Sequence, residues 1–244
     1  MRRCLISCLL VSLLSSVASA AGLNLYWNGC DVSARTNLSF ACQDNSGTST
    51  LVVSFDPPYG ITKLVAATAI IDLMSASPAR PPWWRLEPGG CREGAVSLSF
   101  AAPSLGYCET YWTAATGGIS FLPSDDPRQL RMFVSWSIPE ALAGPVQPGG
   151  EYYAFQLTID HARTVGAGAC AGCSSPVCLV VLQMTLHQAP GLGDYCITNP
   201  FTSNYVSWQG GAGSLACPAA DGAGYPYSVS CTTPALGHTW GRVK

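Results

Sequence analysis

Two cysteines separated by two residues, Cys170 and Cys173, with Cys178 five residues further on, are the group in this chain most typical of metal or redox chemistry. A redox CxxC pair needs a strand-to-helix turn, because the helix N-terminus lowers the pKa of the thiol. Here no helix pattern follows the pair. A zinc site needs four ligands, and the nearest histidines, His161 and His187, occupy outward positions of strand patterns. We therefore expect a disulfide-tied hairpin loop, with half a zinc site or a redox pair as alternatives, and neither a metal nor a cofactor.

The number of cysteines predicts a disulfide framework. The chain has 12 cysteines, of which Cys4 and Cys8 fall in an N-terminal apolar run. The ten that follow are an even number, which in an exported chain is typical of up to five bridges. Short loops close more easily than long ones, which favours the local pairs Cys30–Cys42, Cys91–Cys108 and Cys217–Cys231. The remaining members of the framework are Cys170, Cys173, Cys178 and Cys196, and the sequence does not specify their partners.

Trp83 and Trp84 are candidate ligand-binding residues that follow two prolines. Neighbouring side chains in a strand point to opposite faces, so we expect one indole in the core and the other at the surface. An exposed aromatic ring can stack on a sugar or anchor a partner protein. The alternative is that one tryptophan merely covers a sheet edge or the proline-rich loop.

Asp125 and Asp126 are the second candidate ligand-binding pair. Together with Asp44, Asn45 and Asp56 in other turns, they could supply the oxygen ligands that Ca²⁺ prefers. The chain has no EF-hand or repeat spacing, so ordinary turn-forming aspartates are the alternative.

No catalytic residue is assigned from the sequence. Glycoside hydrolysis needs two carboxylates that converge on one bond. The five glutamates are scattered: Glu87, Glu93, Glu109, Glu140 and Glu151. Nucleophile-elbow, zinc-protease, P-loop and dinucleotide motifs are absent, and the three histidines are not clustered.

The N-terminus predicts export. Arg2 and Arg3 precede an apolar run of signal-peptide length, and Ala18-Ser19-Ala20 is a small-residue cleavage site. A lipobox ending at Cys8 is the competing interpretation, but it would leave almost no apolar run before cleavage. We expect a signal peptide over residues 1–20, no membrane span after its cleavage, and a periplasmic or extracellular mature protein.

Composition narrows the class of protein. Charged residues are only 11% of the 244-residue chain and hydrophobic residues 48%, which allows a large core. Ten basic and fourteen acidic side chains after residue 20 give a net charge of −4. This balance argues against nucleic acid as a partner.

Alternation of apolar and polar residues predicts strands. The expected strands are Leu23–Trp27, Leu51–Phe55, Ile61–Met74, Val96–Phe100, Gln129–Ile138, Glu151–His161 and Cys178–His187. The run Ile61–Met74 is apolar on both faces and is expected to be a central strand. Three stripes are expected in one inner layer: Leu130/Met132/Val134/Trp136, Phe155/Leu157/Ile159 and Val180/Leu182/Met184/Leu186. Their outward neighbours Gln156, Thr158, Asp160, Gln183 and Thr185 should be wet or lie on a polar second face.

Helix signals are scarce, so the chain is expected to be all-β. The clearest is a capping-box spacing from Ser137 to Glu140, which supports one or two turns before Gly144. Many strands with turn signals between them predict a disulfide-stapled β-sandwich of Ig-like or jelly-roll type over residues 21–190. Residues 191–244, rich in small residues, are expected to form a loop-rich C-terminal region packed on the sandwich.

The two ends of the mature chain resemble a group of uncharacterised secreted bacterial proteins. The resemblance is carried by Gly22-Leu23-Asn24-Leu25-Tyr26-Trp27-Asn28-Gly29-Cys30, by Thr239-Trp240-Gly241-Arg242-Val243-Lys244, and by the cysteine-rich loop 170–178. It implies a bacterial envelope or extracellular setting, and no activity.

The sequence therefore predicts a secreted, non-enzymatic β-sandwich with a structural or binding role. Its partner is unknown, with a surface protein or a polysaccharide as the candidates. The alternative is a carbohydrate-binding module or a secreted glycoside hydrolase.

Overall fold

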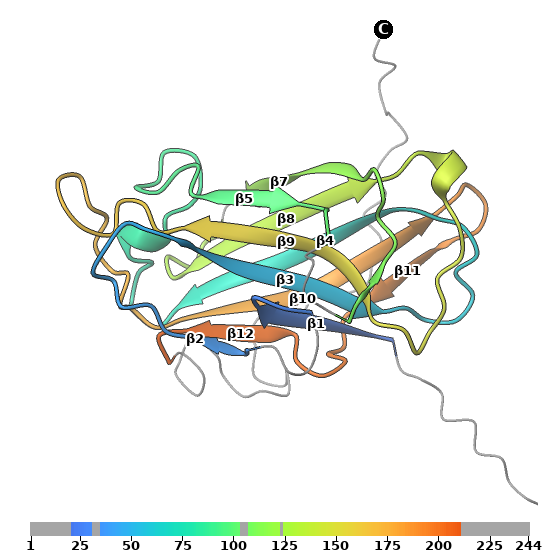
Figure 1. Ribbon diagram of the computed structural model, residues 1–244, viewed down its shortest axis with the longest axis horizontal. Helices are drawn as coiled ribbons and strands as arrows, with labels where there is room; N and C mark the ends of the chain where they lie inside the picture. The colour runs from blue at the N-terminus through green and yellow to red at the C-terminus, as the bar shows by residue number, and fades with distance from the viewer. Residues whose placement is uncertain (1–20, 31–34, 103–106, 123, 211–244) are drawn as a thin grey trace, which may run out of the picture.

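Two β-sheets pack face to face and form a sandwich, as the alternating patterns predict (Figure 1). The computed structural model describes residues 21–30, 35–102, 107–122 and 124–210. The first sheet has the strand order β1 (Gly22–Trp27), β3 (Thr48–Asp56), β9 (Tyr152–Asp160) and β5 (Val96–Ser99), and the short β6 (Glu109–Thr110) also pairs with β9.

The second sheet is larger. Its order is β2 (Asn37–Leu38), β12 (Tyr205–Trp208), β10 (Val177–Gln188), β4 (Leu64–Ser75), β8 (Gln129–Ser137) and β7 (Thr116–Leu122), and β11 (Asp194–Ile197) pairs with β10. The apolar run that was expected to be a central strand is β4, which pairs with β10 on one side and with β8 on the other.

The core lies between the sheets. It contains every residue of two of the three expected apolar stripes. Leu130, Met132, Val134 and Trp136 come from the second sheet, and Phe155, Leu157 and Ile159 from the first. The polar neighbours on β9, Gln156, Thr158 and Asp160, are half-buried.

The prediction for the third stripe is wrong for its first two residues, Val180 and Leu182, because β10 contains a β-bulge. The register between β10 and β4 shifts between Val181 and Gln183. Before the shift, Val181 faces the core while Val180 and Leu182 form a separate apolar cluster on the opposite face. One extra residue in a strand exchanges the two faces. Gln183 therefore lies on that opposite face, where it is buried and donates a hydrogen bond to Thr185.

Only two short 3₁₀ helices interrupt the described strands. One, η2 (Glu140–Leu142), occupies the place of the expected short helix, but no side chain caps it. The other, η1 (Pro82–Trp84), replaces the strand geometry expected around Trp83. No helix in the described part of the chain combines the length and apolar character needed to cross a membrane.

Disulfides staple the sandwich, but the pairs Cys30–Cys42 and Cys91–Cys108 expected from loop length are wrong. The bridges are Cys30–Cys108, Cys42–Cys173 and Cys91–Cys170, and they span 78 to 131 residues. Strand pairing brings these distant loops together, and it outweighs the ease of closing short loops. Cys178 and Cys196 are also disulfide-bonded. The expected pair Cys217–Cys231 lies outside the described residues. The described bridges indicate folding in an oxidising compartment.

The two long edges of the sandwich differ. At the edge drawn lowest in Figure 1, the segment before β12 runs along β1, where the Leu23 amide donates to the Asn199 carbonyl and the Phe201 amide donates to the Leu23 carbonyl. Trp27 makes a further bridge with Arg35. At the opposite edge, β5 and β7 are the last strands of their sheets (Figure 1).

Candidate functional site

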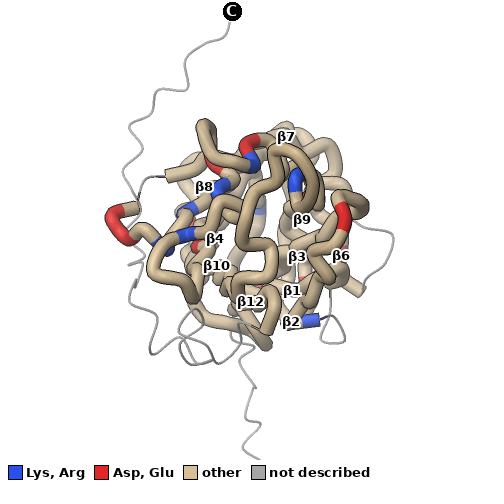
Figure 2. The backbone as a smooth tube through the Cα atoms, turned by 90° about the vertical axis from the view of Figure 1, so that its left-hand side faces the viewer, with Lys and Arg blue, Asp and Glu red and all other residues tan. Residues whose placement is uncertain are grey.

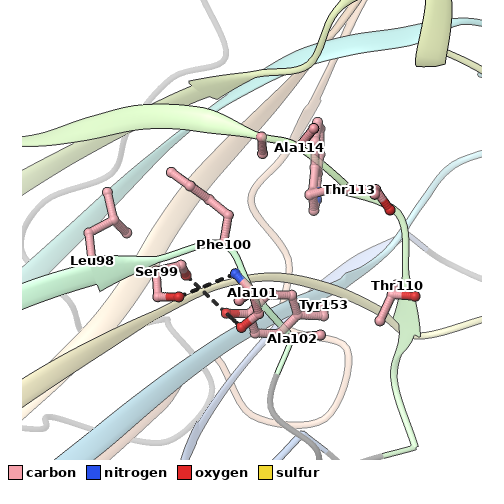
Figure 3. A pocket seen from close by; sticks show the side chains of 11 residues that line it. Leu98, Ser99, Phe100, Ala101, Ala102, Thr110, Thr113, Ala114 and Tyr153 are labelled. Carbon is pink, nitrogen blue, oxygen red and sulfur yellow. Dashed lines mark hydrogen bonds between the residues drawn. The ribbon is translucent and has the colours of Figure 1, made fainter.

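A cavity of about 570 Å³ lies at a break in the edge of the first sheet. β5 ends opposite Gln156 of β9, and β6 ends opposite Tyr153. Between these points Ala154 and Phe155 have no strand partner on that side within the described residues. Figure 3 shows side chains of β5 at one end of the cavity and of β6 at the other. We call this cavity the edge pocket. Its lining residues are Leu98, Ser99, Phe100, Ala101, Ala102, Thr110, Trp112, Thr113, Ala114, Ala115 and Tyr153.

Two tyrosine hydroxyls hold the walls of the edge pocket. The Tyr153 hydroxyl is within hydrogen-bond distance of the carbonyl oxygens of Ser99, at 2.9 Å, and Ala101, at 3.1 Å, so it fixes the chain leaving β5 (Figure 3). On the other wall, the Tyr111 hydroxyl donates to the Leu64 carbonyl at 2.6 Å and accepts from the Gly144 amide at 2.9 Å. The segment that links β6 to β7 is thereby tied to β4.

The pocket rests on the aromatic core. Trp112 packs edge-on against Trp136, with ring centroids 5.4 Å apart, and Phe100 stacks on Trp136 at 5.9 Å. Trp136 comes from the second sheet and contacts Phe155 of the first at 5.1 Å. Both sheets therefore support the floor of the pocket, which favours a rigid binding site.

The electrostatic character of the pocket is neutral. None of the described residues that line it is Asp, Glu, His, Lys, Arg or Cys. Among these residues the titratable group is the Tyr153 phenol, whose pKa burial raises. The indole nitrogen of Trp112 is buried and has no hydrogen-bond acceptor among the described residues. Leaving such a donor unpaired costs about 1–3 kcal/mol.

A second cavity, of about 370 Å³, contains charged residues. Arg80 and Glu87 form an ion pair at 2.5 Å in its wall, and Asp126 accepts from Arg128 at 2.7 Å. Burial lowers the pKa of Arg80, and the Glu87 carboxylate opposes that change. Two carboxylates thus line one cavity, but each already accepts hydrogen bonds from an arginine.

Ser49 and His161 have the contacts of a nucleophile and its base, but they are enclosed. The Ser49 hydroxyl lies 2.9 Å from Nε2 of His161, and Nδ1 lies 2.9 Å from the Ser46 carbonyl oxygen. A neutral ring with its proton on Nδ1 satisfies both contacts. Both side chains are buried, and the Phe40 ring packs against His161 in a tilted arrangement, with ring centroids 3.9 Å apart. The contacts of His161 tie the end of β9 to Ser49 of β3 and to the turn that precedes β3.

Trp83 and Trp84 are both fully buried, so the expectation of one buried and one exposed indole is wrong. In the 3₁₀ turn their side chains do not alternate between faces as they would in a strand. Both rings contact Trp208, with centroids 5.2 Å and 5.4 Å away. In this structure neither indole offers a face to a ligand.

Asp125 and Asp126 belong to the turn before β8. Asp125 is exposed, whereas Asp126 accepts hydrogen bonds from the amide, Nε and Nη2 of Arg128. These contacts are those of a turn-forming aspartate. A role of either residue in ligand binding stays a prediction.

The CxxC cysteines do not bond to each other. Cys170 pairs with Cys91 and Cys173 with Cys42, so neither thiol is available for redox exchange or for zinc. One group of potential metal ligands occurs among the described residues, Cys30, Cys108 and Glu151, whose ligand atoms lie within 4.8 Å of one another. Its two cysteines are joined as a disulfide and offer no thiolate.

Sequence reasoning did not identify the edge pocket. It placed Phe100 and Tyr153 in strands but gave Trp112 no role. The available signal was the uncharged segment from Tyr111 to Thr116, which carries two adjacent aromatic residues between β6 and β7. The cavity itself depends on how β5 and β6 pair with β9, and no local pattern encodes that pairing.

Comparisons with known proteins give only distant likenesses. No family model and no curated protein matches the chain. Among solved structures, a cohesin module from a family 33 glycoside hydrolase of Clostridium perfringens is 8% identical, with a TM-score of 0.33, and the match covers 78% of this chain and 93% of that one. The second type II cohesin module of the adaptor ScaA scaffoldin of Acetivibrio cellulolyticus is 11% identical, with a TM-score of 0.32, over 69% of this chain and 85% of that one.

Proposed function

We propose that this chain is an exported binding protein of the bacterial envelope or extracellular space, and that it recognises an uncharged group in the edge pocket. The observation that carries the proposal is the neutral cavity itself, whose lining includes the aromatic residue Trp112. A largely apolar, pre-formed cavity with a few directed polar groups is typical of a ligand site.

The lining favours binding over catalysis. General acid–base chemistry needs a group that exchanges protons near the working pH. Tyr153 is the titratable side chain that the pocket offers, its hydroxyl is engaged by the Ser99 and Ala101 carbonyls, and burial raises its pKa. The pocket can therefore hold a ligand and orient it, and it has no group suited to transfer protons.

NMR titration with small uncharged rings tests the proposal. The probes are indole, N-acetyl-phenylalaninamide and N-acetylglucosamine, added to ¹⁵N-labelled mature protein. The indole signal of Trp112 is assigned from its loss in Trp112→Phe. We expect at least one probe to move that signal saturably. The indole signal of Trp84, which also lacks an acceptor among the described residues but does not line the pocket, should stay in place.

A charge placed in the pocket provides the control. Thr113 is exposed and lines the pocket, so Thr113→Asp should fold normally and weaken probe binding about tenfold or more. Ala141→Asp, on the exposed face of η2, should leave binding unchanged. The proposal fails if no probe moves the Trp112 signal, or if Thr113→Asp binds as tightly as Ala141→Asp.

A glycoside hydrolase is the second candidate, and the observation that favours it is that Glu87 and Asp126 line the same second cavity. Retaining and inverting mechanisms both use two carboxylates. If the protein releases reducing ends from envelope polysaccharides, Glu87→Gln and Asp126→Asn should each abolish release while Glu93→Gln does not.

A further inference from the structure

The outer edge of β7 is free in the described part of the molecule. β7 pairs with β8 over all seven residues from Thr116 to Leu122. On its other side, no backbone hydrogen bond to a described residue is made by any of these seven residues. A strand edge with unpaired N–H and C=O groups is a template for another strand.

The edge strands β1 and β5 offer less: β1 is hydrogen-bonded on its outer side, and β5 is short. β1 is bonded on its outer side to the segment around Phe201 and to Arg35. β5 has four residues, and the carbonyl of its last residue, Ser99, already accepts from Tyr153. Among the described strands, β7 therefore offers the longest unpaired edge.

β7 lacks the features that protect natural edges. Its sequence, Thr-Gly-Gly-Ile-Ser-Phe-Leu, contains no charged residue and no proline, and its pairing with β8 shows no bulge. Lysine, proline and bulges are the usual devices that prevent edge-to-edge pairing. Leu122 is 38% exposed, although it is a large apolar side chain.

Gly118 leaves the backbone of β7 uncovered on one face, in contrast to Gly117. A Cβ at Gly117 would lie 2.1 Å from the Ser135 carbonyl oxygen, so its own neighbours require glycine at that position. A Cβ at Gly118 would meet nothing within 4 Å. Glycine in a strand is destabilising by about 0.5–1 kcal/mol relative to alanine and often marks a close backbone approach. Nothing in the described fold explains Gly118.

The residue order of β7 suits a second copy of β7. In an antiparallel pair centred on Ile119, Gly118 lies opposite Ser120, and Gly117 lies opposite Phe121. Leu122 then lies opposite Thr116. Phe121 and Leu122 each meet a smaller residue, and Ile119 meets its own copy on the two-fold axis. An aromatic ring beside an edge glycine is a stabilising combination. The neutral strand also lets two chains of the same net charge approach without like charges at the contact.

We infer that two copies of this chain associate through β7 in a symmetric antiparallel pair, which joins the two larger sheets into one continuous sheet. The partner is a second copy because the symmetric register places Phe121 of each chain beside Gly117 of the other and brings no charged residues of β7 together. The inference does not depend on the edge pocket or on its ligand.

Sedimentation equilibrium of the mature protein from micromolar to near-millimolar concentration tests the inference. We expect reversible dimer formation. Ser120→Lys, exposed on β7, places two positive charges next to the two-fold axis and should weaken association about tenfold or more. Ser97→Lys, equally exposed on the other edge strand β5, should leave association unchanged. Circular dichroism melts confirm that both variants fold.

Three results would overturn the inference. The first is a wild-type protein that stays monomeric at every concentration. The second is association that Ser97→Lys disrupts and Ser120→Lys does not, which would place the contact on β5. The third is hydrogen exchange in which the β7 amides are as protected in dilute monomer as in concentrated protein, because another part of the same chain would then cover the edge.

Discussion

The guanidinium of Arg92 lies over the indole of Trp83, with Cζ 3.7 Å from the ring centroid, and both side chains are buried. Nη1 donates to the Trp83 carbonyl at 3.3 Å, and Nη2 donates to the carbonyl and carboxylate of Asp160. Burial lowers the pKa of Arg92, and Asp160 opposes that change. A charged group is thus held in the core by a ring face and by backbone oxygens, where it ties η1 to the end of β9.

Removing this guanidinium should destabilise the fold. Arg92→Met keeps the length of the side chain but removes a donor from the carbonyls of Trp83 and Asp160 and removes the cation–π contact. We expect a loss of about 2–4 kcal/mol in the free energy of unfolding, measured by urea melts. Arg85→Met, at an exposed position on the same loop, should change it by less than about 0.5 kcal/mol. Equal losses in the two variants would contradict the role given to Arg92.

Acidification should weaken the fold through His161. Burial lowers the pKa of His161, with Arg92 as a further cause, while the contact with Ser46 and the nearby Asp44 and Asp160 act in the opposite direction. The unfolded chain therefore binds a proton more readily than the folded one, so stability is lost as the pH falls below about 6.5.

Urea melts at pH 7.5 and pH 5.5 check this dependence on pH. His161→Gln should be less stable than the wild type at pH 7.5, because the paired contacts to Ser46 and Ser49 are disturbed. It should also lose less of its free energy of unfolding between the two pH values. The same loss in both proteins would show that His161 is not the group responsible.

Two neighbouring residues of β9 test the assignment of faces. Leu157 is buried in the core, whereas Thr158 is half-buried on the opposite face. Leu157→Ala should cost about 2–5 kcal/mol through lost burial and a cavity. Thr158→Ala should cost no more than about 0.5 kcal/mol. Denaturant melts under oxidising conditions give both values, and a larger cost at Thr158 would refute the assignment.

The register of β10 makes a prediction about the remaining disulfides. Cys178 and Cys196 are both disulfide-bonded, and Cys196 lies opposite Thr185, seven residues from Cys178 along β10. That separation is roughly 23 Å, whereas bridged cysteines have Cα atoms no more than about 7 Å apart. They cannot bond to each other. We expect two separate bridges, whose partners are Cys217 and Cys231, in place of the local pair Cys217–Cys231.

Peptide mapping of the mature protein without reduction decides the pairing. A peptide that joins Cys217 to Cys231 would contradict the prediction, as would one that joins Cys178 to Cys196. Thiol labelling after denaturation should find no free cysteine. Reduction should lower the free energy of unfolding by several kcal/mol, at about 2–4 kcal/mol for each bridge.

Much of the sandwich could be predicted because a half-buried strand leaves a period of two in the sequence. β8 and β9 follow that period without interruption, and their stripes lie in the core as expected. β10 does not, because its bulge exchanges the faces after Val181. β7 escaped prediction because Gly117 and Gly118 remove half of its alternation. An edge strand buries too little to need a strong pattern.

The contacts between distant segments could not be predicted in the same way. Cys91 lies 17 residues from Cys108 but bonds to Cys170, because the loop after η1 packs beside the loop after β9. The edge pocket likewise arises where β5 stops short of β6 along β9. Both features follow from the order of strands in the sheets, which a list of strand patterns leaves open.

The three bridges overlap along the chain, so between Cys30 and Cys173 the two sides of any peptide bond are also connected through a disulfide. Cys30–Cys108, Cys42–Cys173 and Cys91–Cys170 together enclose every peptide bond from Cys30 to Cys173. A protease that cuts once anywhere in that stretch, including an exposed turn, leaves two fragments that are still covalently joined. The nicked sandwich can keep its sheets paired and its core closed. Severing the molecule there would require at least a second cut or a reductant, so in a compartment rich in proteases its lifetime would depend on its disulfides more than on the integrity of its loops.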